Sequence, residues 1–390
     1  MKRVISILGS TGSIGSSTLN IINKDIKKFS FNVFSANSNY NKIIFQIMKY
    51  KPKYFIISDK KTYLKINKKL KKSKTLILDS YKNIFKKNYK NDITVSAIPG
   101  LVGLEPTIQF TKNSKKILIA NKESIICGWS IINKFAKKYK TKIIPIDSEH
   151  FSINKLLENV KDKDVDKIYI TASGGPFLKM QLKKFKNIKP NDAIKHPKWK
   201  MGKKISVDSA TLMNKVLEVI EAQKIFPFKF HKYRIVIHPQ SLVHAVVNFK
   251  NGLTKLLYHE PDMTVPIANA LFDYKIDIKK YYSKKTNILS NLEFLNVDKK
   301  RFPSVSLIPK LNNYKSTPII INAANEILVD QFLKKIITFN SIYAYLLILL
   351  KDKNYKKYAI QKPVNLKKIF FIDNWARDKI LEIIRNKLKK

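Results

Sequence analysis

The chain is poor in cysteine, glycine and acidic residues, and it has no long apolar run. A single cysteine, Cys127, excludes an intramolecular disulfide among its 390 residues. The longest apolar run, residues 342–350, is about half of what a membrane-spanning helix requires, so we expect a buried helix there. We therefore expect a soluble protein. Because the first strand is expected from Val4, no targeting peptide fits ahead of it, and the expected location is cytoplasmic.

The scarcity of acidic residues leaves a large positive charge. The 28 Asp and Glu against 76 Lys and Arg give a formal net charge of +48. Such a charge ordinarily points to nucleic acid or an anionic membrane. Here, however, the lysines are spread through every segment, as in residues 68–72 and 86–90, which favours a compositional bias with solvated lysine faces. We expect no specific nucleic-acid partner and no membrane partner; a nucleic-acid-binding protein would need a localised basic groove with interleaved aromatics.

Short β-branched runs alternate with helical stretches over the first 150 residues. The expected strands are 4–8, 31–35, 54–58, 76–78, 93–97, 117–120 and 143–146, with helices including 14–23 and 42–49. This alternation is typical of a parallel sheet covered by helices. Further along, the expected strands are 168–172, 234–237 and 245–249, with a helix over 210–224, and beyond Asn322 the pattern is helical.

The predicted fold is therefore of the α/β class, in three domains. Residues 1–150 form an N-terminal Rossmann-like NADP-binding domain, and residues 151–274 form a central α/β catalytic domain. Residues 275–298 are a linker, and residues 299–390 form a small C-terminal α-helical domain.

Three of the 10 glycines lie in the stretch GSTGSIG, residues 9–15, between the first expected strand and helix. In that setting a glycine-rich turn lets backbone N–H groups and a helix N-terminus approach a pyrophosphate. We expect cofactor contacts at Thr11, Gly12, Ser13 and Ile14. The alternative is a tight turn with a helix cap.

The residues after the second strand indicate which dinucleotide binds. An NAD site usually places Asp or Glu there for the ribose hydroxyls, but this chain has Asn37, Ser38 and Asn39, with Lys42 nearby. Neutral hydrogen-bonding groups and a lysine suit a 2′-phosphate. The sequence therefore predicts NADP rather than NAD.

Two carboxylates follow the strand expected at 143–146. On an extended backbone Asp147 and Glu149 point the same way and would share a hard cation, such as Mg²⁺ or Mn²⁺. A helix cap or a solvated loop is the alternative. Glu218, on the helix expected over 210–224, is a candidate third ligand.

The start of that helix favours a phosphate. Ser209 is expected as its N-cap, and Asn214, Lys215 and Glu218 share one face. An ordinary exposed helix face is the alternative.

Two loops extend the polar set. The turn at Ser173 brings N–H groups toward an anion, and the loop with His196 and Trp199 is typical of a lid. For the loop, a surface histidine and a packed aromatic are the alternatives.

Together these motifs resemble one family. GSTGSIG, ANKES, IDSEH, SGGPF, HPKWKMG, VDSATLMNKVLEVIEA, HPQSLVHAVV, PDMTVPIANAL and NAANE follow the order and rough spacing of the 1-deoxy-D-xylulose 5-phosphate reductoisomerases, from Val4 to Glu326. The resemblance implies NADPH- and metal-dependent conversion of 1-deoxy-D-xylulose 5-phosphate to 2-C-methyl-D-erythritol 4-phosphate in non-mevalonate isoprenoid biosynthesis. It also implies a homodimer, and Mg²⁺ or Mn²⁺, with Co²⁺ as a third candidate.

The resemblance also assigns the site residues. The metal ligands are Asp147, Glu149 and Glu218, and the catalytic groups are these three with Lys122 and His196. The implied substrate contacts are Lys122, Ser148, Glu149, Ser173, His196, Ser209, Asn214, Lys215 and Glu218. The implied cofactor contacts are Thr11, Gly12, Ser13, Ile14, Asn37, Ser38, Asn39, Asn121, Glu123 and Gly202. Asn37 stands where the family commonly has glycine, so a left-handed backbone is expected there.

A second enzyme class shares the first domain. A simple NADP-dependent dehydrogenase of the semialdehyde or homoserine type would carry the same glycine loop. It would not need Asp147, Glu149 and Glu218 together.

Overall fold

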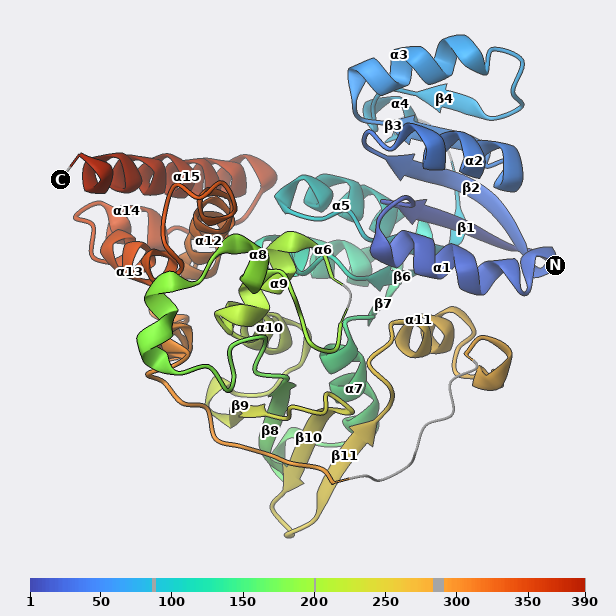
Figure 1. Cartoon of the computed structure of the whole chain (residues 1–390). Coiled ribbons are helices and arrows are strands. Elements are labelled where there is room, and N and C mark those ends of the chain that lie inside the picture. Colours follow the sequence, from blue (N-terminus) through green and yellow to red (C-terminus); the bar gives the residue numbers. More distant parts are fainter. Residues whose placement is uncertain (86–88, 200, 283–290, 390) are drawn as a thin grey trace. The chain divides into compact units, whose positions relative to one another are not determined.

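The computed structural model describes residues 1–85, 89–199, 201–282 and 291–389 (Figure 1). It separates into two compact units. Unit 1 comprises Met1–Ser124, Ile131–Phe151 and Asp262–Lys285, and unit 2 comprises Ile125–Ser130, Ser152–Pro261 and Thr286–Lys390. The units thus alternate along the chain, whereas the division at residues 150, 274 and 298 stays a prediction. The expected linker, 275–298, lies partly outside the described residues, which omit 283–290.

Unit 1 is built on a seven-stranded parallel sheet with the order β4-β3-β2-β1-β5-β6-β7. Its strands are β1 (Arg3–Leu8), β2 (Phe29–Ala36), β3 (Tyr54–Ile57), β4 (Leu76–Leu78), β5 (Asn91–Ser96), β6 (Ser114–Ile119) and β7 (Lys142–Pro145). Its helices include α1 (Ser13–Asn23), α2 (Tyr40–Tyr50), α3 (Lys60–Lys69), α4 (Lys82–Phe85), α5 (Leu104–Lys112) and α11 (Thr264–Leu271). Every strand expected in this region is confirmed, and so is its Rossmann-like α/β fold.

Strand β1 lies near the middle of this sheet and is buried from Ile5 to Leu8. Ile5 and Ile7 have no exposed surface, and they belong to one core cluster with Phe34 of β2 and Phe55 of β3. A sheet covered on both faces favours such apolar-rich strands, which is why the strands could be read from the sequence. Helix α11 was not expected; it packs against α1, and Phe272 meets Phe29 edge to face.

Unit 2 has a smaller, mixed sheet with the order β11-β10-β8-β9. Its strands are β8 (Val165–Ala172), β9 (Tyr233–Ile237), β10 (Val243–Phe249) and β11 (Thr254–Tyr258). Strand β10 runs antiparallel to both β8 and β11, and β9 runs parallel to β8. The edge strand β11 was missed, because Thr254, Lys255 and Leu256 are exposed and show no alternation of apolar residues.

The remaining α-helices of the described chain lie outside these two sets. They are α6 (Lys122–Tyr139), α7 (Ser148–Leu156), α8 (Pro190–Ala193), α9 (Lys203–Ala210), α10 (Met213–Ile225), α12 (Thr317–Leu333), α13 (Phe339–Leu350), α14 (Tyr355–Ala359) and α15 (Leu366–Leu388). Helix α12 packs on α13 and α15, which confirms a helical C-terminal region. Helix α13 carries the apolar run at 342–350 and buries Ile342, Leu346 and Leu349. No described helix is long and apolar enough to cross a membrane.

The helix expected over 210–224 is confirmed as α10, with a later start, and a separate helix, α9, precedes it. Helix α9 ends at Ala210 and α10 begins at Met213, so Ser209 lies in the last turn of α9 and is not an N-cap. The break occurs at Leu212, whose φ of 61° is left-handed, and the N–H of Met213 donates to Oγ1 of Thr211 at 3.3 Å. No glycine or proline marks this break, which explains why the sequence placed the helix start at residue 210 rather than at Met213.

Candidate functional site

The glycine loop of unit 1 follows β1 and leads into α1, as expected. Gly9 has a φ of 82°, and a Cβ atom built there would come within 2.6 Å of the Ala97 carbonyl oxygen. A Cβ at Gly15 would come within 2.4 Å of the Gly9 carbonyl oxygen. These two glycines therefore permit the loop to pack against the chain's own backbone. Gly12 is exposed and has a looser fit, since a Cβ built there would have the Gly9 carbonyl oxygen as its nearest neighbour, at 3.3 Å.

The N-terminus of α1 can receive an anion. Gly12 is the N-cap, with an extended ψ of 178°, and Ser13 and Ile14 form the first turn. First-turn N–H groups have no acceptor within their own helix, and they carry the positive end of the helix dipole. The Lys42 ammonium donates to the Thr11 carbonyl at 3.3 Å, which adds a positive charge beside the loop.

The three residues after β2 are exposed and are ordered by local hydrogen bonds. Asn39 caps α2 by accepting from the N–H of Lys42 at 3.2 Å, and the Ser58 hydroxyl donates to Oδ1 of Asn37 at 3.1 Å. Ser38 lies between them, and its carbonyl accepts from Thr62. The expected left-handed backbone at Asn37 is wrong, since its φ is not positive. The side chain of Asn37, rather than a special φ, fixes the turn.

Asn121 and Glu123 open helix α6. Oδ1 of Asn121 accepts from the Ser124 N–H at 2.6 Å, and its amide donates to the carbonyls of Ile98 and Gly100. Glu123 is buried in the first turn, where the helix dipole favours a negative charge. Asn121 thus ties the loop after β5 to the helix that carries Lys122.

The acidic pair lies at the start of α7, not on extended backbone as expected. Strand β7 ends at Pro145, and Glu149 is already in the first helical turn. Oδ1 of Asp147 accepts from the N–H of Glu149 at 3.3 Å and lies 3.2 Å from Nδ1 of buried His150. A carboxylate only accepts, so Nδ1 of His150 carries the proton.

The helical turn nevertheless keeps the functional groups of unit 1 together. The Lys122 ammonium is 3.8 Å from Oδ2 of Asp147, and the Ser148 hydroxyl donates to Oε2 of Glu149 at 2.5 Å. Oδ1 of Asp147 therefore caps α7, while Oδ2 lies near the Lys122 ammonium. The sequence left open whether Asp147 is a helix cap or a metal ligand, and this geometry is compatible with both.

In unit 2, Ser173 and His196 are hydrogen-bonded to each other. Nδ1 of His196 accepts from the N–H groups of Lys198 and Trp199, at 3.1 and 2.8 Å. In the neutral ring the proton is therefore on Nε2, which donates to Oγ of Ser173 over 2.9 Å. Oγ also accepts from the Gly175 N–H at 3.1 Å. The Ser173 hydroxyl hydrogen is thereby directed to a further acceptor, such as a phosphate oxygen.

Ser209 lies next to this turn. A Cβ on Gly175, whose φ is 63°, would come within 2.9 Å of the Ser209 carbonyl oxygen, so the two segments touch. In the first turn of the next helix, α10, the amide of Asn214 donates to Glu218. The Lys215 ammonium pairs with the same carboxylate at 2.8 Å. Glu218 is 1% exposed, so this charge depends on its partners. The alternative interpretation, an exposed helix face, is therefore wrong for Lys215 and Glu218, which are both buried.

The candidate lid carries an aromatic contact that the sequence did not predict. Trp199 meets the ring of His244 edge to face, and His244 stacks on His259 with ring centres 3.8 Å apart. Burial and the neighbouring His244 lower the pKa of His259 to about 3, so this ring stays neutral. Gly202 follows the lid as the exposed N-cap of α9.

The structure thus brings the expected residues together in separate groups within each unit. In unit 1 they are the glycine loop with Lys42, and Lys122 with Asp147, Ser148 and Glu149. In unit 2 they are Ser173, His196, Ser209, Asn214, Lys215 and Glu218. The sequence did not predict the roles of His150 or of the buried Asp208. His150 is part of the motif IDSEH, which is the one sequence feature that could have pointed to it. Asp208 has no comparable sequence signal, because its partner Asn325 lies far away in the chain.

Three family models match this chain. The model described as 1-deoxy-D-xylulose 5-phosphate reductoisomerase matches residues 5–128. The 1-deoxy-D-xylulose 5-phosphate reductoisomerase C-terminal domain matches residues 143–226, and the DXP reductoisomerase C-terminal domain matches residues 259–379.

Individual relatives match over almost their whole length. The chain is 47% identical to the 1-deoxy-D-xylulose 5-phosphate reductoisomerase of Pelagibacter ubique strain HTCC1062, over 97% of this chain and 99% of that protein. It is 40% identical to the enzyme of that name from Wolbachia pipientis subsp. Culex pipiens, over 99% and 98%. Among solved structures, it is similar to DOX-P reductoisomerase in complex with NADPH, fosmidomycin and magnesium, with a TM-score of 0.91, 33% identity and 98% coverage of each chain. The Zymomonas mobilis enzyme in complex with NADPH gives a TM-score of 0.87 and 30% identity, over 98% and 99%.

Proposed function

Because this chain belongs to the 1-deoxy-D-xylulose 5-phosphate reductoisomerase family, we propose that it converts 1-deoxy-D-xylulose 5-phosphate to 2-C-methyl-D-erythritol 4-phosphate. The reaction is a retro-aldol and aldol rearrangement of the carbon skeleton followed by hydride reduction, and it uses NADPH and a divalent cation. Family membership sets aside the simple dehydrogenase of the semialdehyde or homoserine type.

The observation that carries the proposal is the anion-binding group of unit 2. The Ser173 hydroxyl hydrogen is directed outward by two bonds to its oxygen, and Gly175 of the same turn lies against Ser209. Asn214 and Lys215 extend this group from α10. Hydroxyls, an amide and an ammonium are the groups that hold a phosphate dianion. Binding energy at this unreactive end of the substrate helps to hold the reacting end in place.

A metal site is the second part of the proposal. Asp147, Glu149 and Glu218 each offer a carboxylate oxygen, the donor that Mg²⁺ and Mn²⁺ prefer. A cation held by them would supply Lewis-acid chemistry, stabilising the charge that develops on substrate oxygens. The Lys122 ammonium beside Asp147 would orient the same oxygens, and the hydrogen bonds of Asp147 to Glu149 and His150 would fix its carboxylate.

The nicotinamide cofactor is the third part. The N–H groups of Ser13 and Ile14 would hold its pyrophosphate, and Asn37, Ser38, Asn39 and Lys42 its 2′-phosphate. NADPH supplies the hydride, and the protein supplies its orientation. We assign Asn121, Glu123 and Gly202 to the cofactor by the same family resemblance. The loop with His196 and Trp199 would exclude water over the site.

One assay tests the whole assignment. Purified protein is mixed with NADPH and 1-deoxy-D-xylulose 5-phosphate, with Mg²⁺, with Mn²⁺, or with a chelator, and the fall of NADPH absorbance is followed. We expect oxidation of NADPH that requires both the sugar phosphate and the cation. Oxidation with an amino-acid semialdehyde and not with the sugar phosphate would overturn the proposal.

Three finer properties belong to the proposal as well. We expect a homodimer, to be checked by sedimentation in solution, and a cytoplasmic location, to be checked by fractionation of cells. The domain boundaries at residues 150, 274 and 298 can be checked by limited proteolysis with mass spectrometry of the fragments.

A further inference from the structure

The motif NAANE, residues 322–326, has no role in the function proposed so far. It lies on α12, in the helical region that follows the residues assigned to the substrate and cofactor. Asn322 and Asn325 have no exposed surface at all. Two buried amides on one helix require partners, because an amide taken from water without a hydrogen bond is costly. The partners of these two side chains differ.

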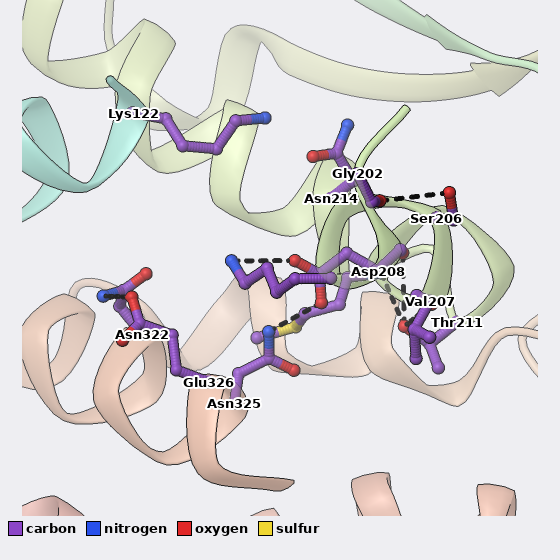
Figure 2. A network of polar contacts seen from close by, with 12 residues as sticks. Lys122, Gly202, Ser206, Val207, Asp208, Thr211, Asn214, Asn322, Asn325 and Glu326 are labelled. Carbon is purple, nitrogen blue, oxygen red and sulfur yellow. Dashed lines mark hydrogen bonds and ion pairs between the residues drawn. The ribbon is translucent and has the colours of Figure 1, made fainter. Parts of the chain in front are cut away.

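Asn325 contacts the helix that carries Ser209. Its Nδ2 donates to Oδ1 of Asp208 at 2.8 Å, and the two residues are 117 positions apart in the sequence (Figure 2). Asp208 is 1% exposed, and its other oxygen pairs with Lys204 at 2.9 Å. A carboxylate can only accept, so the amide nitrogen, not the oxygen, of Asn325 must face it. The direction of the contact is therefore fixed.

Asn322 serves a different purpose. Its amide donates to Oε1 of Glu326 at 3.2 Å, and the other oxygen of Glu326 binds Arg377 of α15. Arg377 also pairs with Asp373 at 2.6 Å. This second set joins α12 to α15 through Glu326. In the motif, Asn325 thus bonds to α9, Asn322 bonds within α12, and Glu326 bonds to α15.

Ser209 is the residue that the Asp208 contact would hold in place. It follows Asp208 directly in the last turn of α9, and its carbonyl accepts from the Leu212 N–H at 3.1 Å. On its other side lies Gly175, close enough that no Cβ would fit. The backbone of Ser209 is therefore held between the turn after β8 and the buried carboxylate of Asp208.

We propose that Asn325 is a positioning residue for substrate binding: through Asp208 it holds Ser209 where the substrate phosphate binds. The inference rests on the proposed function, since it concerns the same phosphate site. Without the Asn325 amide, the side-chain partner that the Asp208 carboxylate keeps among the described residues is Lys204, which belongs to the same helix. The last turn of α9 then loses the hydrogen bond between Asp208 and α12. We expect Ser209 in that turn to move relative to Gly175.

The test compares Asn325→Ala with Asn322→Ala. Both variants remove a fully buried amide from the same helix, so they impose a similar loss of packing, but only the first touches Asp208. We expect Asn325→Ala to raise the KM for 1-deoxy-D-xylulose 5-phosphate about tenfold, the scale of one hydrogen bond to a charged group. The KM for NADPH should stay within about twofold in both variants, and Asn322→Ala should leave the KM for the sugar phosphate within about twofold.

A binding measurement separates this inference from the function on which it rests. Inorganic phosphate is titrated against the enzyme loaded with NADPH and Mg²⁺, which needs no turnover. Weaker phosphate binding in Asn325→Ala alone supports the positioning role, even if the wild-type chain failed to turn over the sugar phosphate. Such a failure would overturn the proposed reaction only.

A reversed pair provides the third comparison. Asp208→Asn combined with Asn325→Asp restores one amide-to-carboxylate bond with donor and acceptor exchanged. We expect the double variant to bind phosphate more tightly than Asp208→Asn alone. Equal phosphate affinity in Asn325→Ala, Asn322→Ala and wild type, or equal losses in both alanine variants, would overturn the inference. Thermal unfolding of each variant confirms that the folded protein is being measured.

Discussion

The two compact units hold their functional groups by different means. In unit 1 the cofactor loop is fixed by close backbone packing: Gly9 lies against the Ala97 carbonyl and Gly15 against the Gly9 carbonyl. Asn39 and Asn121 are helix caps. In unit 2 the corresponding groups are fixed by buried charges, with Glu218 held by Lys215, and Asp208 by Lys204 and Asn325. A site fixed by close backbone packing should tolerate changes of nearby side chains but be disrupted when a substitution adds volume. A site fixed by buried charges should be disrupted when one partner of a charge pair is removed.

The largest effect is expected in unit 2, from Glu218→Gln. The substitution keeps the shape of the side chain but removes a proposed metal ligand and the charge that Lys215 neutralises. We expect turnover to fall on the order of a thousandfold, because Lewis-acid stabilisation contributes several kcal/mol. NADPH affinity should stay unchanged, and it is measured by the quenching of tryptophan fluorescence.

Glu105→Gln serves as the control for that variant. Glu105 is an exposed residue in the first turn of α5, and its replacement should leave turnover within about twofold. Undiminished turnover of Glu218→Gln at saturating Mg²⁺ would remove this residue from the metal site.

The backbone fit of unit 1 is tested by Gly15→Ala. The added Cβ meets backbone atoms at 2.4 Å that cannot rotate away, so we expect a loss of about 1–3 kcal/mol in the free energy of unfolding. NADPH binding should weaken by at least about tenfold, since the loop must shift. Denaturant unfolding and NADPH titration measure the two effects.

Gly12→Ala separates packing from ligand contact. Its Cβ has its nearest neighbour at 3.3 Å, and its φ of −73° suits any residue, so unfolding should change by less than about 0.5 kcal/mol while NADPH binding still weakens. If both alanine variants unfolded at the same denaturant concentration as wild type, the backbone-fit interpretation of unit 1 would be wrong.

A charge also contributes in unit 1, at Lys42. If its ammonium binds the 2′-phosphate, Lys42→Met should raise the KM for NADPH about tenfold and leave the KM for NADH unchanged. Lys49→Met, in the last turn of the same helix, is the matched control. An equal change for the two cofactors would place Lys42 outside the 2′-phosphate site.

The smallest effect concerns a side-chain network in unit 1. Burial raises the pKa of Asp25, but hydrogen bonds from Lys280, Tyr281 and Lys28 outweigh it and lower that pKa to about 2. Since the folded-state pKa is depressed, the stabilisation is complete above about pH 4 and is lost as the pH falls toward 2.

Asp25→Asn should therefore lower the free energy of unfolding at pH 7 by about 1 kcal/mol. This is less than the pKa shift alone would give, because Lys280 is half exposed and solvent screens its charge. The same variant should flatten the pH dependence of unfolding between about pH 4 and 2. An unchanged slope would show that other carboxylates determine the acid sensitivity of unit 1.

The same contrast explains what the sequence could predict. The strands of the unit 1 sheet could be read because buried parallel strands are rich in apolar residues, as in β3, where Tyr54–Ile57 are all buried. The glycine loop could be read because its constraint is local in sequence. Asp147 and Glu149 could be noticed as a pair because two carboxylates directly after an expected strand are a local signal, although Glu149 lies on helix α7. Their role as metal ligands stays a prediction.

The remaining features depend on tertiary contacts that leave no periodic signal. The break at Leu212 depends on a left-handed residue with no glycine, and β11 is an exposed edge strand. The bond between Asp208 and Asn325 joins residues 117 positions apart, and no local pattern predicts such a pairing. Asn325 was noticed only as part of a motif, without a role.

The distance along the chain between Asp208 and Asn325 also sets an order in time. During synthesis from the N-terminus, the backbone contact of Gly9 with Ala97 becomes available once about a quarter of the chain has emerged. The partner of Asp208 emerges only after residue 325, and the α15 arginine that binds the same motif later still. A nascent chain can therefore complete its cofactor loop long before its phosphate site, so an incomplete product of translation would lack a fully built substrate site.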